Sequence, residues 1–217
     1  MSKPLRFFCM IILLIITIFP GNVLSENPPD TSDIEKKVTA FLEKHRGAWR
    51  DMNVPESDGR VLHNIIVENG YTRALEIGTS TGHSGIWIAL ALSKTGGKLT
   101  TIDIDKGRHK EALDNFSEAG VSEFVDALLA DAHELVPELE GPYDFIFVDA
   151  DKGWYKRYLE LLLPKLTVGG CFTAHNVLNR YMGMGDFLDY LESLDNMETT
   201  IDKSSRSGVS VSYKRKE

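Results

Sequence analysis

The stretch ALEIGTSTGHS, residues 74–84, decides the fold because it joins a short apolar run to a turn and then to a second apolar segment. Residues 74–77 are expected to form a buried strand, and residues 84–92 a buried helix. Between them, Gly78 and Gly82 let the backbone turn sharply and allow a ligand to approach it closely. A strand, such a turn and a helix in this order predict the first βαβ unit of a parallel sheet.

The same alternation of strands and helices continues toward the C-terminus. Short apolar runs predict further strands at residues 99–104, 124–129, 143–148, 170–174, 197–201 and 208–213. Helical patterns occur at residues 106–119, 132–139, 154–166 and 187–194, and two earlier helices begin at the capping pattern Ser32-x-x-Glu35 and at Pro55. No helix separates the last two strands, so they are expected to pair antiparallel. The predicted fold is therefore α/β, with a Rossmann-like doubly wound seven-stranded sheet, mainly parallel with an antiparallel C-terminal hairpin, and helices on both faces.

The composition is that of a globular domain with an acidic balance. The 217 residues include 24 basic and 32 acidic side chains, which gives a net charge of −8, and 42% of the residues are hydrophobic. Such a charge argues against nucleic-acid binding, which needs a clustered cationic surface. Beyond residue 25 only one cysteine, Cys171, occurs, so no disulfide is expected within the domain.

The N-terminal segment differs from the rest of the chain. Lys3 and Arg6 precede an apolar run at residues 7–19, which is the layout of a secretory signal peptide. A cleaved signal peptide and an uncleaved membrane anchor both stay open, and both predict a domain that is exported to the periplasm or medium, or is membrane-anchored. A later translation start would leave the protein in the cytoplasm. The expected organisation is a signal peptide or anchor at residues 1–25, a linker at 26–31 and one domain at 32–217.

Acidic residues stand at the ends of the first three predicted strands, where parallel α/β sheets bind their ligands. Glu76 precedes the first turn, where an acid repels a pyrophosphate and suits a cationic ligand, and the dinucleotide pattern G-x-G-x-x-G is absent. Asp103 is placed to accept the hydroxyl groups of a ribose. For Asp131 two interpretations stay open, contact with an adenine amino group and a helix N-cap.

The ends of the fourth and fifth predicted strands are expected to lie side by side. Asp149, His175 and Asn176 together offer two oxygen ligands and one imidazole, a set that suits a divalent metal ion. Lys152 would stand beside such an ion, whose charge would let the amine act as a base near neutral pH. The alternative is that Asp149 and Asp151 are helix caps and that Lys152 is an ordinary surface charge.

From about Met52 to the C-terminus, the chain resembles class I S-adenosylmethionine (SAM)-dependent O-methyltransferases of the catechol / caffeoyl-CoA type. Six segments carry the resemblance: MNV at 52–54, LEIGTSTGHS at 75–84, TIDID at 101–105, DA at 131–132, FIFVDADK at 145–152 and AHNVL at 174–178. The resemblance implies an enzyme that transfers a methyl group from SAM to a hydroxyl of a small hydroxylated, catechol-like aromatic acceptor. A monomer or a homodimer is compatible with it.

The resemblance also implies a role for each matched residue. The residues that the resemblance assigns to cofactor binding lie at the first three strand ends and in the segments beside them. They are Val54, Glu76, Gly78, Thr79, Ser84, Asp103, Asp131 and Ala132. Asp149 and Asn176 match ligands of a divalent cation, usually magnesium, and Lys152 matches the general base. His175 stands where the family has Asp, which weakens magnesium binding and favours manganese or zinc, or means that no metal is bound.

Other functions stay open at this point. One is a SAM-binding pseudo-enzyme, or a methyltransferase whose metal dependence is altered by His175. Another is an NAD-dependent oxidoreductase, which Glu76 and the missing glycine disfavour. The loops near Met52, Trp154 and residues 181–184 are expected to contact the acceptor, whose identity no pattern reveals.

Overall fold

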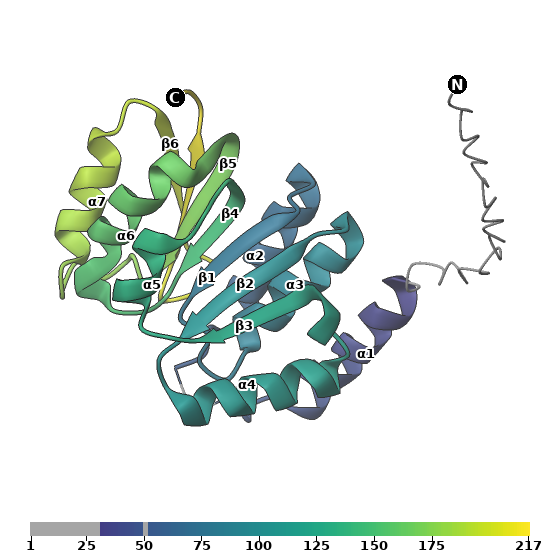
Figure 1. Cartoon of the computed structure of the whole chain (residues 1–217). Helices are drawn as coiled ribbons and strands as arrows, with labels where there is room; N and C mark the ends of the chain where they lie inside the picture. Colours follow the sequence, from purple (N-terminus) through teal and green to yellow (C-terminus); the bar gives the residue numbers. More distant parts are fainter. Residues whose placement is uncertain (1–30, 50–51) are drawn as a thin grey trace, which may run out of the picture.

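The computed structural model describes residues 31–49 and 52–217, which form three layers with a seven-stranded sheet in the middle (Figure 1). The strand order is β3-β2-β1-β4-β5-β7-β6. The strands are β1 (Arg73–Ile77), β2 (Lys98–Asp103), β3 (Val125–Leu129), β4 (Tyr143–Val148), β5 (Leu166–His175), β6 (Met197–Asp202) and β7 (Val209–Lys214). Strands β1 to β5 pair in parallel, whereas β7 pairs antiparallel with both β5 and β6. The predicted sheet and its C-terminal hairpin are therefore confirmed.

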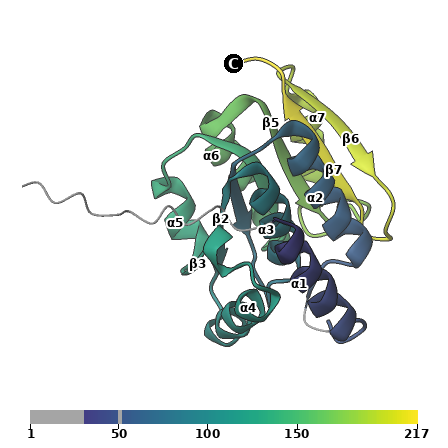
Figure 2. The ribbon, with the colours of Figure 1, turned by 90° about the vertical axis from the view of Figure 1, so that its right-hand side faces the viewer.

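Helices cover both faces of the sheet (Figures 1 and 2). One face carries α1 (Thr31–Lys44), α2 (Glu56–Asn69), α3 (His83–Thr95) and α4 (Lys106–Ala119), and the other carries α5 (Ala132–Glu138), α6 (Tyr155–Leu162) and α7 (Met184–Ser193). Alternate strand residues serve the two faces, as the pleat requires. In β1, Ala74 belongs to the core beneath α2 and α3, and Leu75 to the core beneath α6 and α7.

The largest error in the predicted boundaries lies between α6 and β5, and α7 also begins earlier than predicted, at Met184. The helix expected over residues 154–166 ends at Leu162, and after a 3₁₀ turn at Leu163–Lys165 the chain enters β5 at Leu166. Leu166 pairs with Tyr143 and is buried. Pairing in the sheet therefore outweighs the helical pattern of this apolar run.

The predicted leader at residues 1–25 lies outside the described residues, as do residues 26–30 of the predicted linker. Thr31, the last linker residue, is the first residue of α1. In the part of the chain that the structure describes, no helix has the length and apolar character needed to cross a membrane.

The turn after β1 brings three strand ends together at one edge of the sheet. Gly78 has a φ of 103°, and a Cβ atom there would lie 2.9 Å from the carbonyl oxygen of Asp149. The Gly78 amide donates to the carbonyl of Ile102, and the Asp149 amide donates to the carbonyl of Ile77, both at 2.9 Å. Only glycine combines this backbone conformation with such a close approach.

Gly59 fixes how closely α2 approaches α3, since a Cβ there would lie 2.2 Å from Trp87 Cδ1. Gly59→Ala is expected to lower the free energy of unfolding by about 1–3 kcal/mol because the indole must move. The matched control is Gly185→Ala in α7, where the nearest atom lies 3.5 Å away. This control should be neutral or stabilising by up to about 1 kcal/mol. Equal unfolding free energies for the two variants in urea would contradict the packing.

Candidate functional site

Three cavities follow the carboxyl ends of the strands. The strand-end cavity, of about 600 Å³, is lined by Met52, Asn53, Pro55, Gly78, Ser80, Asp103, Ile104, Arg108, Asp149, Ala150, Asp151, Lys152, His175, Asn176, Met182 and Ser207. The flank cavity, of about 280 Å³, is lined by Ile77, Gly78, Ile102, Asp103, Ile104, Ala130, Asp131, Ala132, His133, Ala150, Asp151 and Tyr158. The loop cavity, of about 300 Å³, is lined by Lys152, Asn176, Asn179, Tyr181, Met182, Met184, Arg206 and Ser207. Shared lining residues show that the strand-end cavity adjoins the other two.

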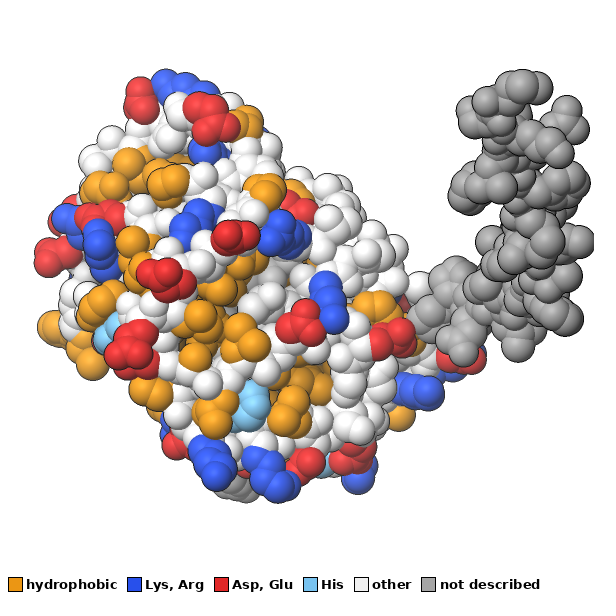
Figure 3. Space-filling view, viewed as in Figure 1, with side chains coloured by type: hydrophobic (Ala, Val, Ile, Leu, Met, Phe, Trp, Pro, Cys, Tyr) orange, Lys and Arg blue, Asp and Glu red, His pale blue; other side chains and the backbone are white. Residues whose placement is uncertain are grey.

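Exposed hydrophobic side chains border these cavities. Met52 and Ile104 beside the strand-end cavity and Tyr181 and Met182 beside the loop cavity are all more exposed than buried, with Tyr181 at 80%. On the face shown in Figure 3, hydrophobic side chains lie among interspersed acidic and basic ones. Apolar groups beside polar cavity walls suit a small molecule that combines an apolar body with polar groups.

Glu76 places a carboxyl group in the interior at the end of β1. Its Oε2 accepts a hydrogen bond from Thr101 Oγ1 at 2.6 Å, and Ser84 also bonds to the carboxyl group. Among the described residues, Glu76 Oε1 has no hydrogen-bond partner. Burial outweighs the two hydroxyl bonds and raises the pKa of Glu76 to about 7. A cationic ligand group would satisfy Oε1 and favour the ionised carboxylate.

Asp103 lies between the flank and strand-end cavities and lines both. Its Oδ2 accepts from the Ser80 amide at 2.7 Å, and its Oδ1 accepts from the Asp105 amide at 2.8 Å. The two amides fix the orientation of the carboxylate, which keeps lone pairs available to further donors. Asp103 thus stands where a ligand spanning both cavities would pass.

Of the two interpretations of Asp131 left open by the sequence, the structure shows the helix N-cap, and contact with an adenine amino group stays a prediction. It is the N-cap of α5, where its Oδ1 accepts from the His133 amide at 2.9 Å, and it also lines the flank cavity with Ala132. The His133 ring stacks on Trp154 with ring centroids 3.6 Å apart, and its Nε2 lies 2.8 Å from Asp151 Oδ2. Trp154 therefore supports the wall of the flank cavity.

Four of the predicted cofactor residues lie behind the cavity walls: Val54, Glu76, Thr79 and Ser84 line none of the three cavities. The carbonyl of Val54 accepts from His83 Nδ1 at 2.8 Å, and Thr79 Oγ1 lies 2.6 Å from Thr101 Oγ1 in the buried interior. Ser84 bonds to the buried carboxyl group of Glu76. Direct contact of these four with a ligand stays a prediction.

Lys152 and Asp149 form an ion pair where the strand-end cavity meets the loop cavity. Lys152 Nζ donates to Asp149 Oδ1 at 2.9 Å. The Asp149 side chain is 10% exposed and that of Lys152 28%, so the amine is the more accessible partner. Asp151, and not Asp149, occupies the capping position of the 3₁₀ turn at Lys152–Trp154, without a capping hydrogen bond from its side chain. Of the two predicted caps, Asp151 therefore stands at a cap position and Asp149 does not.

His175, at the end of β5, lies between two carboxylates. Its Nδ1 is 3.0 Å from Asp149 Oδ2, and its Nε2 is 2.8 Å from Asp58 Oδ2. Because a carboxylate only accepts hydrogen bonds, this geometry needs a proton on each ring nitrogen. Burial opposes the charge of the ring, but the two carboxylates outweigh it and raise the pKa of His175 to about 9. Burial also opposes ionisation of Asp58, yet hydrogen bonds from His175 and Ser205 keep the pKa of Asp58 below its ordinary value.

The predicted metal ligands come together, but their donor atoms do not fit a divalent cation. Asp149 directs one oxygen to Lys152 and the other to His175. A doubly protonated imidazole has no lone pair for a metal. Asn176 lines the cavity beside them with a φ of 62°. Within residues 31–49 and 52–217, no group of three or more His, Cys, Asp or Glu side chains could hold a metal ion.

Asp58 and Ser205 are the site residues that sequence reasoning missed. Asp58 lies in the first turn of α2, and Ser205 lies in the turn between β6 and β7. Ser205 Oγ donates to Asp58 Oδ2 at 2.7 Å. An acid in the first turn of a helix is favoured by the helix dipole alone, so Asp58 carries no signal of a further role.

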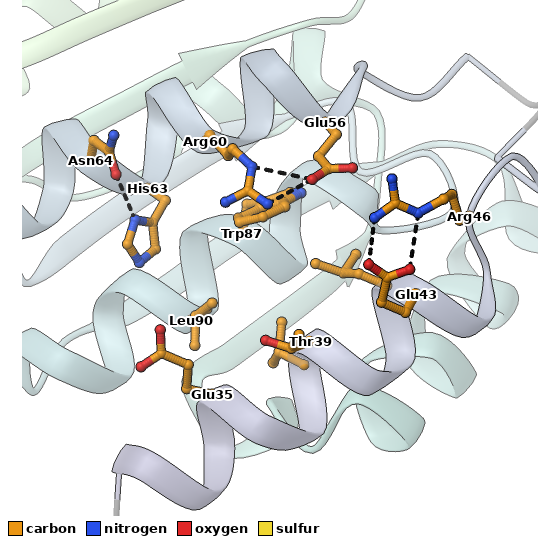
Figure 4. Close-up of a pocket in the computed structure, with 12 residues that line it drawn as sticks. Glu35, Thr39, Glu43, Arg46, Glu56, Arg60, His63, Asn64, Trp87 and Leu90 are labelled. Atoms are coloured by element: carbon orange, nitrogen blue, oxygen red, sulfur yellow. Dashed lines mark hydrogen bonds and ion pairs between the residues drawn. The ribbon is translucent and has the colours of Figure 1, made fainter.

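A fourth cavity, of about 180 Å³, lies between α1, α2 and α3 (Figure 4). Four of its charged side chains pair with one another, Arg46 with Glu43 and Arg60 with Glu56, and Glu35 pairs with Lys94 outside the cavity. Arg60 also lies over the ring of Trp87, 4.9 Å from its centroid. None of the residues predicted to bind a ligand lines this cavity, so it takes no part in the site.

Known protein families and sequences include clear relatives of this chain. The model of the O-methyltransferase family matches residues 26–203. Caffeoyl-CoA O-methyltransferase of Populus kitakamiensis is 34% identical over 148 residues, which cover 66% of this chain and 63% of that enzyme. Flavonoid 3',5'-methyltransferase of Vitis vinifera is 32% identical over 160 residues, which cover 71% of this chain and 67% of that enzyme. The match thus spans somewhat less than two thirds of the length of the Populus enzyme.

Solved structures share the fold. An O-methyltransferase from Bacillus cereus in complex with SAH has a TM-score of 0.70 and 24% identity, covering 89% of this chain and 94% of that one. An O-methyltransferase of Streptomyces achromogenes involved in tomaymycin synthesis, in complex with SAM, has a TM-score of 0.70 and 25% identity. The match covers 83% of this chain and 90% of that one. Since the family model spans most of the 217 residues, this chain belongs to the O-methyltransferase family.

Proposed function

We propose that this protein is a SAM-dependent O-methyltransferase whose acceptor is a small, catechol-like aromatic molecule. The observation that carries the proposal is the buried carboxyl of Glu76 near the end of β1, whose Oε1 has no partner among the described residues. A buried polar group without a partner costs free energy, and the ammonium group of a bound ligand removes that cost. Family membership and relatives that are solved with SAM or SAH support the same cofactor.

The cavities and charges match the parts of SAM in order. The flank cavity, with Ile104 and Ala132 on its walls, suits an adenine ring. The carboxylate of Asp103 stands between the two cavities and suits the ribose hydroxyls. The strand-end cavity then takes the methionine portion, with Glu76 beneath it at the end of β1.

Transfer to oxygen needs an acceptor that loses its proton. SAM supplies a methyl group on a positively charged sulfur, and the acceptor oxygen takes this carbon while the bonding pair stays with sulfur. A phenolate is a far better nucleophile than a phenol, so removal of the proton assists the step. Lys152 first releases to solvent the proton that it holds in the resting ion pair. Its neutral amine then receives the acceptor's proton at Nζ, and Asp149 Oδ1, 2.9 Å away, holds the amine in place.

The loop cavity is the proposed acceptor site. Lys152 stands at its inner end, and the exposed side chains of Tyr181 and Met182 offer apolar surface to an aromatic ring. The names of the Populus and Vitis relatives refer to hydroxylated aromatic acceptors, which supports an acceptor of this class. The proposal includes no divalent cation, because the donor atoms of Asp149 and His175 are directed at other side chains.

Asp103→Asn is expected to weaken SAM binding by about 10- to 100-fold, because hydrogen bonds to a charged acceptor contribute about 1.5–3 kcal/mol. The control is Asp105→Asn, which keeps the N-cap of α4, where asparagine caps as well as aspartate. Isothermal titration calorimetry with SAM measures both affinities. Equal affinities for the two variants, or wild-type protein that binds NAD and not SAM, would contradict the assignment.

The ligand-free protein is expected to lose stability as the pH rises from about 4.5 to about 7, because folded Glu76 holds its proton up to a pKa of about 7. The folded state binds more protons than the unfolded state in this window, so the free energy of unfolding falls by roughly 3 kcal/mol and then levels off. Glu76→Gln should remove this part of the pH dependence in urea unfolding. Wild type and Glu76→Gln with the same pH profile would place the carboxyl outside the buried interior.

Lys152→Met is expected to lower kcat about 10²- to 10⁴-fold while the Kd for SAM stays nearly constant, since general bases contribute in this range. Methyl transfer to a panel of catechols measures kcat, and calorimetry measures Kd. Lys156→Met on the adjacent helix, whose amine lies over the ring of Tyr190, is the control and should retain full activity. An unchanged kcat for Lys152→Met would remove Lys152 from the mechanism.

A further inference from the structure

We infer that His175 itself provides the positive charge beside Asp149, with Asp58 as the residue that positions it, so that methyl transfer in this protein runs without a divalent cation. This inference rests on the proposed methyltransferase function. It assigns a role to Asp58, which no sequence pattern indicated, and it follows from the donor atoms described above.

Four charged side chains form one row from the interior to the cavity. Asp58 Oδ2 lies 2.8 Å from His175 Nε2, His175 Nδ1 lies 3.0 Å from Asp149 Oδ2, and Asp149 Oδ1 lies 2.9 Å from Lys152 Nζ. In the resting protein, where Lys152 is paired as an ammonium with Asp149, negative and positive groups alternate, so each charge has an opposite neighbour and the row is neutral as a whole. A neutral row leaves no net negative charge to attract a cation.

The inner end of the row is firmly held. The Asp58 side chain is 1% exposed and the His175 side chain 5%, whereas Lys152 at the outer end reaches the cavities. Ser57 Oγ donates to Asp58 Oδ1 at 3.1 Å, and Ser205 Oγ donates to Asp58 Oδ2 at 2.7 Å. Segments from α2, β5 and the β6–β7 turn therefore converge on one carboxylate.

A divalent cation on Asp149 would compete with His175 for Oδ2 and would repel the charged ring. Removal of His175 from its place would leave Asp58 as a buried charge without a counter-ion, which is strongly unfavourable. The protonated ring thus occupies the position that a cation would need. The protonated ring also directs Asp149 Oδ1 toward Lys152. Side chains of the protein, without a metal ion, therefore hold in place the lysine that takes the acceptor's proton.

Metal dependence tests the inference directly. The full-length protein is dialysed against EDTA, and methyl transfer from SAM to 3,4-dihydroxybenzoate and other catechols is measured with EDTA, Mg²⁺ or Mn²⁺. The expected kcat/KM with EDTA lies within about 2-fold of the values with either ion. A loss above about 10-fold that Mg²⁺ or Mn²⁺ restores would overturn the inference and leave the methyltransferase function intact.

Metal binding gives a readout that needs no turnover. Electron paramagnetic resonance of Mn²⁺ titrated into the wild-type protein should show free Mn²⁺ throughout, and stoichiometric binding would overturn the inference. His175→Asp removes the cation and adds a hard oxygen ligand, so this variant should bind Mn²⁺. His175→Gln is the matched control and should bind none. Absence of methyl transfer under every condition would instead overturn the proposed function.

Asp58→Asn tests the positioning role. It should lower kcat about 10-fold while KM for the acceptor and Kd for SAM stay within about 2-fold, as for other residues that orient a directly acting group. Glu56→Gln, on the same helix and paired with Arg60 outside the row, is the control with wild-type kcat. Unchanged kcat in Asp58→Asn, or an equal rise in KM and Kd, would contradict positioning through His175.

Discussion

The contact between Gly78 and the backbone of Asp149 holds the two halves of the site together. Because any side chain at Gly78 would collide with this backbone, β1 and β4 end at the same level, with the turn of one against the loop of the other. The flank and strand-end cavities share Gly78 for this reason. On one side the groups assigned to the cofactor follow from β1 and β2. On the other side those assigned to proton transfer follow from β4 and β5.

Two buried acids show how the protein meets the cost of ionisable groups in its interior. Asp58 is compensated within the chain, by a protonated imidazole and two hydroxyl groups. Glu76 is compensated only in part, by Thr101 and Ser84, and its pKa rises accordingly. The first arrangement is complete without a ligand, and under the proposed function the ammonium group of the cofactor completes the second. Both acids are buried, so their exposed fractions do not distinguish them. The number of hydrogen-bond partners that the chain supplies to each carboxyl group does.

The sequence predicts the framework well because alternating apolar runs and turn glycines are local signals. All strands and helices are found, and the error at Leu166 arises where an apolar run suits either element. Residues at strand ends, such as Asp103 and Lys152, are also predictable because the topology places them together. The partner of His175 is not, since Asp58 comes from a helix outside the strand pattern. In a sequence, a histidine among carboxylates is interpreted as a metal ligand. Only the structure gives the hydrogen-bond partner of each ring nitrogen.

The bond between Ser205 and Asp58 joins residues 147 positions apart in the chain. During synthesis on the ribosome, Asp58 leaves the exit tunnel early, and its last partner appears only when the final hairpin is made. Until then the carboxylate has no complete set of partners, so an interrupted chain holds an acid that resists burial. The buried start of α2 therefore gains its full set of hydrogen bonds only after the β6–β7 turn has been synthesised, although α2 itself is made early.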